Sequence, residues 1–188
     1  RVRSSAASDV YKRQEIEEFT NVMNKTAFRT HVSAVLETMH QDQYVCLLVI
    51  DIDKFKSIND TFGHLVGDQV LLHVVKVLKE VLRSSDFIGR IGGDEFCVFM
   101  KNILSLPYLY ERLDEILDRL VNTRIEDRQV LSASIGVCMS NHICRYDEIF
   151  QKADEAMYHA KHAGGNCYDI TELSTSQDIA KNDKIFYI

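Results

Sequence analysis

Three acidic residues in this sequence lie where their carboxylates could bind a cation together. Asp94 and Glu95 follow a Gly-Gly pair between two apolar stretches, which predicts a hairpin with acids at its tip. Asp51 lies where the apolar run Val45–Ile50 ends, as at the end of a buried strand. Converging carboxylates repel unless a cation joins them, and their oxygens suit Mg²⁺ that bridges phosphates. A solvated turn for the hairpin acids and a cap or turn for Asp51 are the commoner interpretations, and both stay open here.

The apolar pattern predicts the elements that must position these acids. Helical spacing runs from Ile16 to Met39, with a possible break at Asn24–Thr26. The other expected elements are a strand over Tyr44–Ile50, a short helical turn over Phe55–Phe62, a helix over Val66–Leu82, a hairpin over Asp86–Met100, a helix from Pro107 to Leu120, a strand over Val130–Cys138, a helix over Tyr146–Ala163 and a strand over Asn166–Ile170. This mixture around a central hairpin favours an α+β sandwich, with helices packed on a mostly antiparallel sheet.

Composition limits the class of protein. The chain has 188 residues, enough for one domain, and its 22 basic and 28 acidic residues give a net charge of −6. That balance argues against a broad DNA-binding surface, so we expect no nucleic-acid partner. The longest apolar run is far shorter than the ~18 residues of a membrane helix, and we expect neither a membrane segment nor a signal peptide. Five cysteines without Cys-x-x-Cys spacing favour reduced core thiols and a cytoplasmic location.

The ends of the chain differ from its middle. Residues 1–14 are rich in Ser, Ala and Arg and lack helical periodicity, so we expect a non-native or disordered leader there. Residues 15–170 form the expected domain, and residues 171–188 a C-terminal tail without an assigned element. We expect the chain to be the cytosolic part of a larger sensor, membrane-bound or not.

Two runs of sequence resemble the signatures of a known family. Arg90-Ile91-Gly92-Gly93-Asp94-Glu95-Phe96 is similar to the signature of the GGDEF family of diguanylate cyclases, which join two GTP molecules into cyclic di-GMP. The string DIDKFKSINDTFGHLVGD, which begins at Asp51, resembles the second signature of that family. The resemblance covers residues 15–170 and implies a palm-like, ferredoxin-related fold.

The resemblance implies roles for the acids and for one lysine. The side chains of Asp51 and Asp94 and the backbone carbonyl of Ile52 match the ligands of Mg²⁺ (or Mn²⁺). Asp94 or Glu95 would help to deprotonate the 3′-hydroxyl that attacks the α-phosphate. Lys56 matches a cation that stabilises developing phosphate charge.

The resemblance also implies the contacts with GTP. Asn59 and Asp68 match the residues that read the guanine edge, although by themselves they fit a turn and a helix N-cap. The other implied substrate contacts are His64, Gly92, Gly93 and Lys161. Asp53 is expected to be a cap and not a metal ligand.

A third match implies inhibition by the product. Arg83-x-x-Asp86 precedes the glycines at the offset of the family's inhibitory site, where Arg83 would bind a phosphate and Asp86 a base edge of cyclic di-GMP. Arg90 would contact the same ligand. The plain interpretation is a basic helix end followed by a turn.

Two departures from the family pattern put the catalytic rate in question. Gly165 stands where a second phosphate-binding cation is expected, and Asn21 replaces a glycine of an N-terminal motif. The first interpretation is a diguanylate cyclase that needs a homodimer, because each domain holds one GTP. The alternatives are a weakly active domain that senses GTP or cyclic di-GMP, and a domain that only dimerises.

Overall fold

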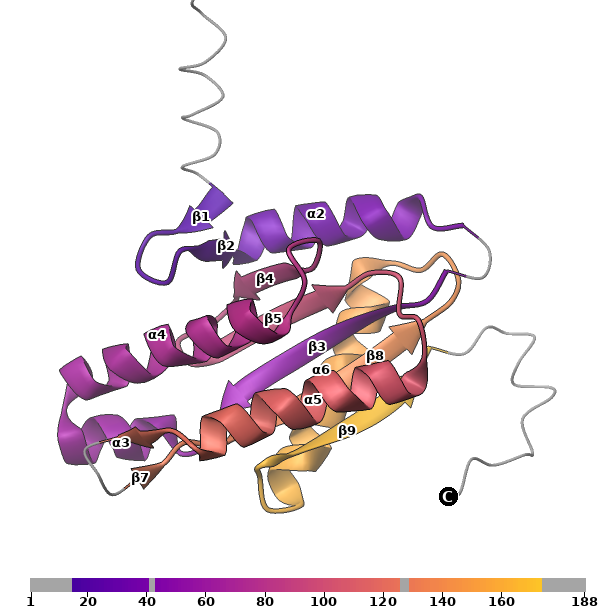
Figure 1. Ribbon diagram of the computed structural model, residues 1–188. Helices are drawn as coiled ribbons and strands as arrows, with labels where there is room; N and C mark the ends of the chain where they lie inside the picture. The colour runs from indigo at the N-terminus through magenta and orange to yellow at the C-terminus, as the bar shows by residue number, and fades with distance from the viewer. Residues whose placement is uncertain (1–14, 41–42, 126–128, 174–188) are drawn as a thin grey trace, which may run out of the picture.

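One sheet runs through the centre of the protein. The computed structural model describes residues 15–40, 43–125 and 129–173. Within them the sheet has seven strands in the order β1-β2-β4-β5-β3-β8-β9 (Figure 1). Their bounds in that order are Ile16–Glu17, Val22–Asn24, Phe87–Arg90, Glu95–Met100, Val45–Ile52, Ala133–Ser140 and Cys167–Glu172. Neighbours are antiparallel except for β2–β4 and β8–β9. The expected α+β fold with a mostly antiparallel sheet is confirmed.

Helices on both faces cover this sheet. In the described residues they are α2 (Lys25–Glu37), α3 (Phe55–Phe62), α4 (His64–Val81), α5 (Leu106–Val121) and α6 (Tyr146–His162). Local capping sets two of the starts. Asn24 Oδ1 accepts from Ala27 N at 3.0 Å, and Ser105 Oγ accepts from Tyr108 N at 3.3 Å. Pro107 lies in the first turn of α5, as predicted.

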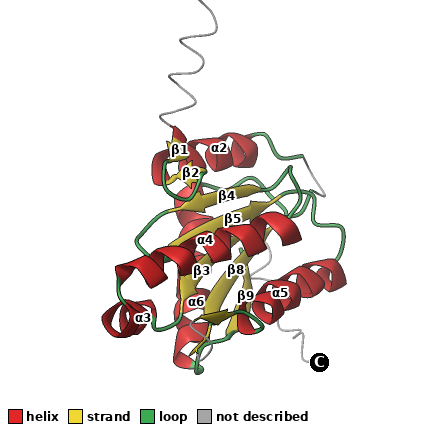
Figure 2. Ribbon diagram, turned by 60° about the vertical axis from the view of Figure 1, so that its left-hand side comes forward, coloured by secondary structure: helices red, strands yellow, loops and turns green. Residues whose placement is uncertain are grey.

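The two faces of the sheet carry separate apolar cores. Along β3, Leu48 and Ile50 pack in the core of α4 and α5, whereas Leu47 and Val49 pack in the core of α2 and α6. Figure 1 shows α4 and α5 in front of the sheet and α6 behind it, and Figure 2 shows the same layers from the side. A Cβ on Gly136 would overlap the backbone of α6, so this helix lies directly on β8.

The helix expected from Ile16 to Met39 is wrong in its first part. Residues 16–17 and 22–24 are the antiparallel strands β1 and β2, and only Lys25–Glu37 is helical. The turn between the strands has φ 55° at Asn21. Met23 of β2 pairs in parallel with Gly89 of β4. This pairing with a distant segment overrides the helical spacing of the apolar residues.

The strand expected over Val130–Cys138 is only partly correct. β8 begins at Ala133, and β7 (Gln129–Val130) pairs with β6 (Arg124–Ile125) as a separate short hairpin. The chain therefore pairs with β6 before this short stretch and with β3 and β9 after it. Apolar alternation alone does not indicate such a change of partner.

The cysteines contribute to packing. Four of the five are buried and all five are free thiols. Burial raises the pKa of the Cys138 thiol to about 12, so this thiol is protonated at neutral pH. Within the described residues, every helix is too short or too polar to cross a lipid bilayer.

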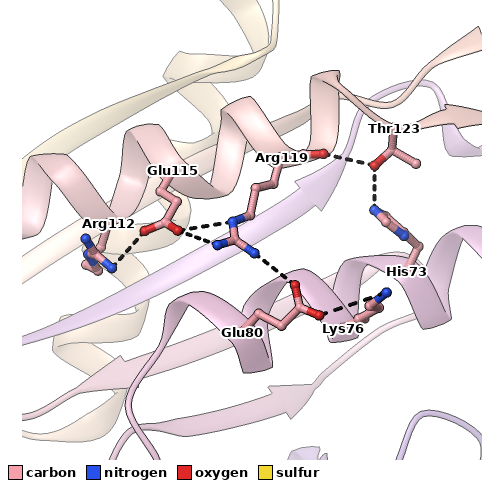
Figure 3. A network of polar contacts seen from close by, with 7 residues as sticks. All are labelled: His73, Lys76, Glu80, Arg112, Glu115, Arg119 and Thr123. Carbon is pink, nitrogen blue, oxygen red and sulfur yellow. Dashed lines mark hydrogen bonds and ion pairs between the residues drawn. The ribbon is translucent and has the colours of Figure 1, made fainter.

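Charged side chains connect α4 and α5 at the surface (Figure 3). Arg119 binds Glu80 across the helices at 2.8 Å and Glu115 within α5 at 2.7 Å. Thr123 Oγ1 donates to the Arg119 carbonyl at 2.9 Å and makes a second hydrogen bond with His73 Nε2, which lies 2.5 Å away. A hollow of about 810 Å³ is lined by His73, Glu80, Glu115 and Arg119 among others, but the hairpin acids and Asp51 do not line it.

Candidate active site

Asp51 lies near the end of β3 between neighbours from both adjacent strands. Its register partners are Glu95 of β5 and Ser134 of β8. The next residue, Ile52, donates its N–H to the Asp94 carbonyl at 3.4 Å. Antiparallel pairing of β3 with β5 therefore brings Asp51 and the two hairpin acids to the same end of the sheet.

The acids at this end of the sheet are partly removed from water and close to one another. Asp51 is 6% exposed. Burial raises its pKa, Asp94 and Asp53 raise it further, and Lys161 opposes them. The pKa of Glu95 is raised by burial and by the charges of Asp51 and Asp94. A group of carboxylates with raised pKa values has a high affinity for positive charge.

Lys161 brings positive charge to Asp51 from the last turn of α6. Its Nζ donates to Asp51 Oδ1 at 2.7 Å. The pKa of Lys161 is raised, because its hydrogen bond to Asp51 and the charges of the nearby acids outweigh the effect of burial. The two residues are 110 positions apart in the sequence, and the packing of α6 on β8 brings them together.

The hairpin tip is a four-residue loop, Ile91–Asp94, between β4 and β5. The two glycines are not used for a left-handed turn, because neither has a positive φ. Gly92 makes room instead, because a Cβ there would lie 2.4 Å from Glu95 Oε2. A Cβ on Gly93 would have no neighbour within 4 Å, so the backbone there is open to a ligand. Arg90 braces the loop by donating to the Gly93 carbonyl at 2.6 Å.

The segment after β3 carries the residues expected to contact guanine. Asn59 lies in α3, and its Oδ1 is buried without a hydrogen-bond partner among the described residues. A Cβ on Gly67 would overlap this oxygen, so α3 and α4 fit closely only with glycine there. Lys56, His64 and Asp68 are exposed on α3 and α4. Each is accessible, and no contact in the structure joins them to Asp51.

Arg83 and Asp86 lie together between α4 and β4. Asp86 Oδ2 accepts from Arg83 N at 3.0 Å, and Asp86 N donates to the Arg83 carbonyl at 3.0 Å. The Arg83 guanidinium stacks on Tyr108 at 4.4 Å from the ring centroid. Both residues line a cavity of about 330 Å³ that also contacts β2. Arg90 does not line this cavity; it pairs with Glu17 at 3.5 Å.

The turn after α6 explains why glycine fits at position 165. Gly164 and Gly165 have φ values of 121° and 75°, which favour glycine. A Cβ on Gly165 would lie 2.7 Å from Asp53 Oδ2. Asp53 accepts from Ser134 Oγ at 2.7 Å and from Asn166 N at 2.9 Å. Asp53 therefore holds the α6–β9 turn and is not the helix cap that the sequence predicted.

The structure adds residues that the sequence reasoning missed. Glu17 accepts from Thr20 N at 2.8 Å and pairs with Arg90, which links the N-terminal strands to the hairpin. Asp154 of α6 raises the pKa of Glu95 in addition to burial and the nearer acids. Ser134 holds Asp53. No local motif marks these side chains, because their roles depend on contacts with distant segments.

The donors at the end of β3 fit a hard divalent cation. Asp51 and Asp94 offer carboxylate oxygens, and Mg²⁺ prefers oxygen ligands. In the part of the chain that the structure describes, no three acidic, His or Cys side chains form a complete metal site by themselves. Magnesium sites of this kind take their remaining ligands from water and from substrate phosphates.

Comparison with known proteins identifies the family of this chain. Residues 15–167 match the family described as "Diguanylate cyclase, GGDEF domain". The chain is 39% identical over 155 residues to the probable diguanylate cyclase DgcC of Escherichia coli K12, and 36% identical over 152 residues to the probable diguanylate cyclase DgcT. Each match covers 78% of this chain, but only 40% of DgcC and 33% of DgcT. The chain thus spans two fifths or less of these two relatives.

Solved structures share the fold. The coiled coil and GGDEF domain of DgcB from Caulobacter crescentus, in complex with c-di-GMP, has a TM-score of 0.79 at 27% identity, covering 89% of this chain and 90% of that chain. The GGDEF domain of PA1120 from Pseudomonas aeruginosa has a TM-score of 0.75 at 29% identity, covering 88% and 99%. The palm-like fold is confirmed by both.

Proposed function

Because the chain belongs to the GGDEF domain family, we propose that it condenses two molecules of GTP into cyclic di-GMP with release of pyrophosphate. The observation that carries this proposal is the pairing of Asp51 with Glu95 in the β3–β5 register, together with the hydrogen bond from Ile52 to Asp94. These contacts put the acids of both signatures at one end of the sheet.

The metal would be held by Asp51 and Asp94 with the carbonyl of Ile52, as Mg²⁺ or Mn²⁺. Bound there, a divalent cation supplies positive charge that offsets charge on the triphosphate. Asp51 is already fixed within its strand by pairing on both sides. Its carboxylate can therefore bind the cation without a large change in backbone conformation.

Glu95 is the better placed of the two hairpin acids to accept a proton. Its pKa is raised by burial and by neighbouring acids, and a raised pKa suits a general base near neutral pH. In each half-reaction the 3′-hydroxyl oxygen of one GTP bonds to the α-phosphorus of the other. The bond between that α-phosphorus and the oxygen that bridges it to the β-phosphate breaks, and pyrophosphate leaves. The hydroxyl proton passes to Glu95 or Asp94.

The remaining contacts would hold GTP in place. Asp68 would accept from the guanine N1–H and 2-amino groups, and Asn59 would use its NH₂ because its oxygen is buried. Lys161 and Lys56 would bind phosphates. His64, Gly92 and Gly93 would make the smaller contacts with GTP.

Catalysis would require a homodimer, since one domain supplies one 3′-hydroxyl and one α-phosphate. Product would inhibit the enzyme by binding at Arg83 and Asp86, with Arg90 as a further contact. The cavity beside Arg83 and the Arg83–Asp86 turn support such a site. We place the catalytic unit at residues 15–170 and propose a cytoplasmic location.

A nucleotide assay tests the proposed reaction. The domain is incubated with GTP and Mg²⁺, with ATP in place of GTP as the comparison, and products are separated by liquid chromatography with mass detection. We expect cyclic di-GMP in the sample with GTP and no cyclic dinucleotide in the sample with ATP. Complete lack of product at high protein concentration would sink the proposal.

A second candidate function is a weakly active domain that senses GTP or cyclic di-GMP. Gly165 favours it, because one expected phosphate contact is missing and the turn excludes a side chain. Calorimetric titration with cyclic di-GMP separates the two: tight binding without turnover of GTP supports the sensor. Binding that is unchanged in Arg83→Ala would count against the site at Arg83.

A further inference from the structure

Lys161 contacts the buried acid that the proposed metal site depends on. Its Nζ lies 2.7 Å from Asp51 Oδ1, and among the described residues no other cation makes an ion pair with Asp51. The Asp51 side chain is 9% exposed, whereas that of Lys161 is 46% exposed. The carboxylate is therefore fixed within the strand, and the ammonium reaches it on a long side chain that can change rotamer.

Lys161 also neutralises the neighbouring acids. Asp51, Asp94 and Asp53 all raise the pKa of Lys161 against the opposing effect of burial. Lys161 is the cation that opposes the raised pKa of Glu95. The acids need positive charge to lie so close together, and in this arrangement the ammonium supplies it.

A metal ion and the ammonium would compete for Asp51. Two cations bound to one carboxylate lie within a few ångströms of each other and repel, most strongly where water is scarce. Lys161 is also the residue proposed to bind a phosphate of GTP. A triphosphate that arrives with its metal offers the ammonium a new anionic partner and leaves Asp51 free.

On the basis of the proposed function, we infer that Lys161 is an exchangeable internal counter-ion. Its ammonium pairs with Asp51 until the phosphates of a nucleoside triphosphate bind the ammonium instead. The metal then binds tightly only together with the nucleotide. By linkage, the metal favours nucleotide binding by the same factor. Lys161 thus makes the metal site responsive to substrate.

Direct metal binding tests this inference. Mn²⁺ alone is titrated into the domain at mildly alkaline pH, and free Mn²⁺ is followed by electron paramagnetic resonance. Lys161→Met, which keeps the apolar stem and removes the charge, is expected to bind Mn²⁺ about tenfold more tightly than the parent, equivalent to ~1.4 kcal/mol. The control Lys152→Met lies on the same helix in an exposed pair with Glu155 and should bind like the parent.

Two further variants keep the test decisive. Lys161→Arg retains the charge and should bind Mn²⁺ as weakly as the parent, and Lys161→Gln replaces Lys161→Met if thermal unfolding shows that the latter is misfolded. Equal Mn²⁺ affinity in the parent and in a folded charge-removing variant overturns the inference but leaves the proposed function intact. If no protein binds Mn²⁺ even with a non-hydrolysable GTP analogue, the proposed function itself fails.

Discussion

Four carboxylates lie together at the end of β3, and the hydrogen bonds and ion pairs that each one makes indicate its role. Asp53 accepts two hydrogen bonds from the protein and holds the turn after α6. Asp51 is paired with Lys161, which a substrate can displace. Asp94 and Glu95 come from the hairpin, and no cation pairs with either within the described residues. One carboxylate is thus structural, and three are available for chemistry.

Removing the charge of Glu95 should separate catalysis from stability. Glu95→Gln is expected to lower cyclic di-GMP formation by about a hundredfold or more, the usual contribution of a positioned base. It should also raise the melting temperature at neutral pH, because burial and nearby acids raise the pKa of Glu95 and so disfavour its charged form in the folded state. Turnover and thermal unfolding of the same samples check both effects.

The control for this variant is Glu172→Gln, which changes the same side chain at the exposed end of β9. It should leave turnover and melting temperature unchanged. A fall in melting temperature for Glu95→Gln comparable to that of a core mutation would contradict the assignment, since it would make Glu95 a structural residue.

At the scale of elements, the turn from α6 to β9 decides how the phosphate end of the site is built. Gly164 N donates to Lys161 O at 3.4 Å and Gly165 N to Ala160 O at 3.2 Å, which ends the helix in a Schellman arrangement. Asp53, the residue directly after β3, packs against Gly165. The absence of a side chain at position 165 is therefore part of the turn's geometry.

An arginine at this position should not restore the family's phosphate contact. Gly165→Arg is expected to destabilise the domain by about 1–3 kcal/mol, because it forces a side chain into a left-handed conformation and against Asp53. Urea unfolding measures the loss, and a GTP assay should show no gain in turnover. Higher turnover at unchanged stability would show instead that Gly165 is a real deficit.

The contact between α4 and α5 predicts a pH dependence of stability. Burial lowers the pKa of His73 from 6.5, with Lys76 adding to the effect and Glu80 opposing it. The unfolded chain therefore binds more protons than the folded one just below pH 6.5, so stability falls as pH falls through that window. His73→Gln should lose less stability than the parent between neutral and mildly acidic pH in urea unfolding. An identical pH profile would contradict this account.

Sequence predicted the elements whose signals are local and missed those that depend on distant partners. The sequence predicts the β4–β5 hairpin, the end of β3 and the helix α6, since apolar runs and turn residues mark them. The strands β1 and β2 were predicted as helix, because pairing with β4 decides their conformation. The Lys161–Asp51 pair likewise depends on packing between segments 110 positions apart.

At the scale of the whole molecule, the proposed chemistry needs more than one chain. The acids lie at one end of a single sheet, and each domain provides one set of them. Two domains that face each other would bring each 3′-hydroxyl to the α-phosphate of the opposite GTP. The Arg83–Asp86 site lies between α4 and β4, apart from the acids, so a ligand there could act without entering the catalytic site.

The most direct test is the initial rate of cyclic di-GMP formation from GTP and Mg²⁺ at increasing concentrations of the domain. We expect the rate to rise more than linearly with protein concentration, and we expect Asp94→Asn to give no product. The control Asp147→Asn changes an exposed residue at the start of α6 and should behave like the parent. No cyclic di-GMP at the highest protein concentration, or equal rates for the parent and Asp94→Asn, would contradict the account.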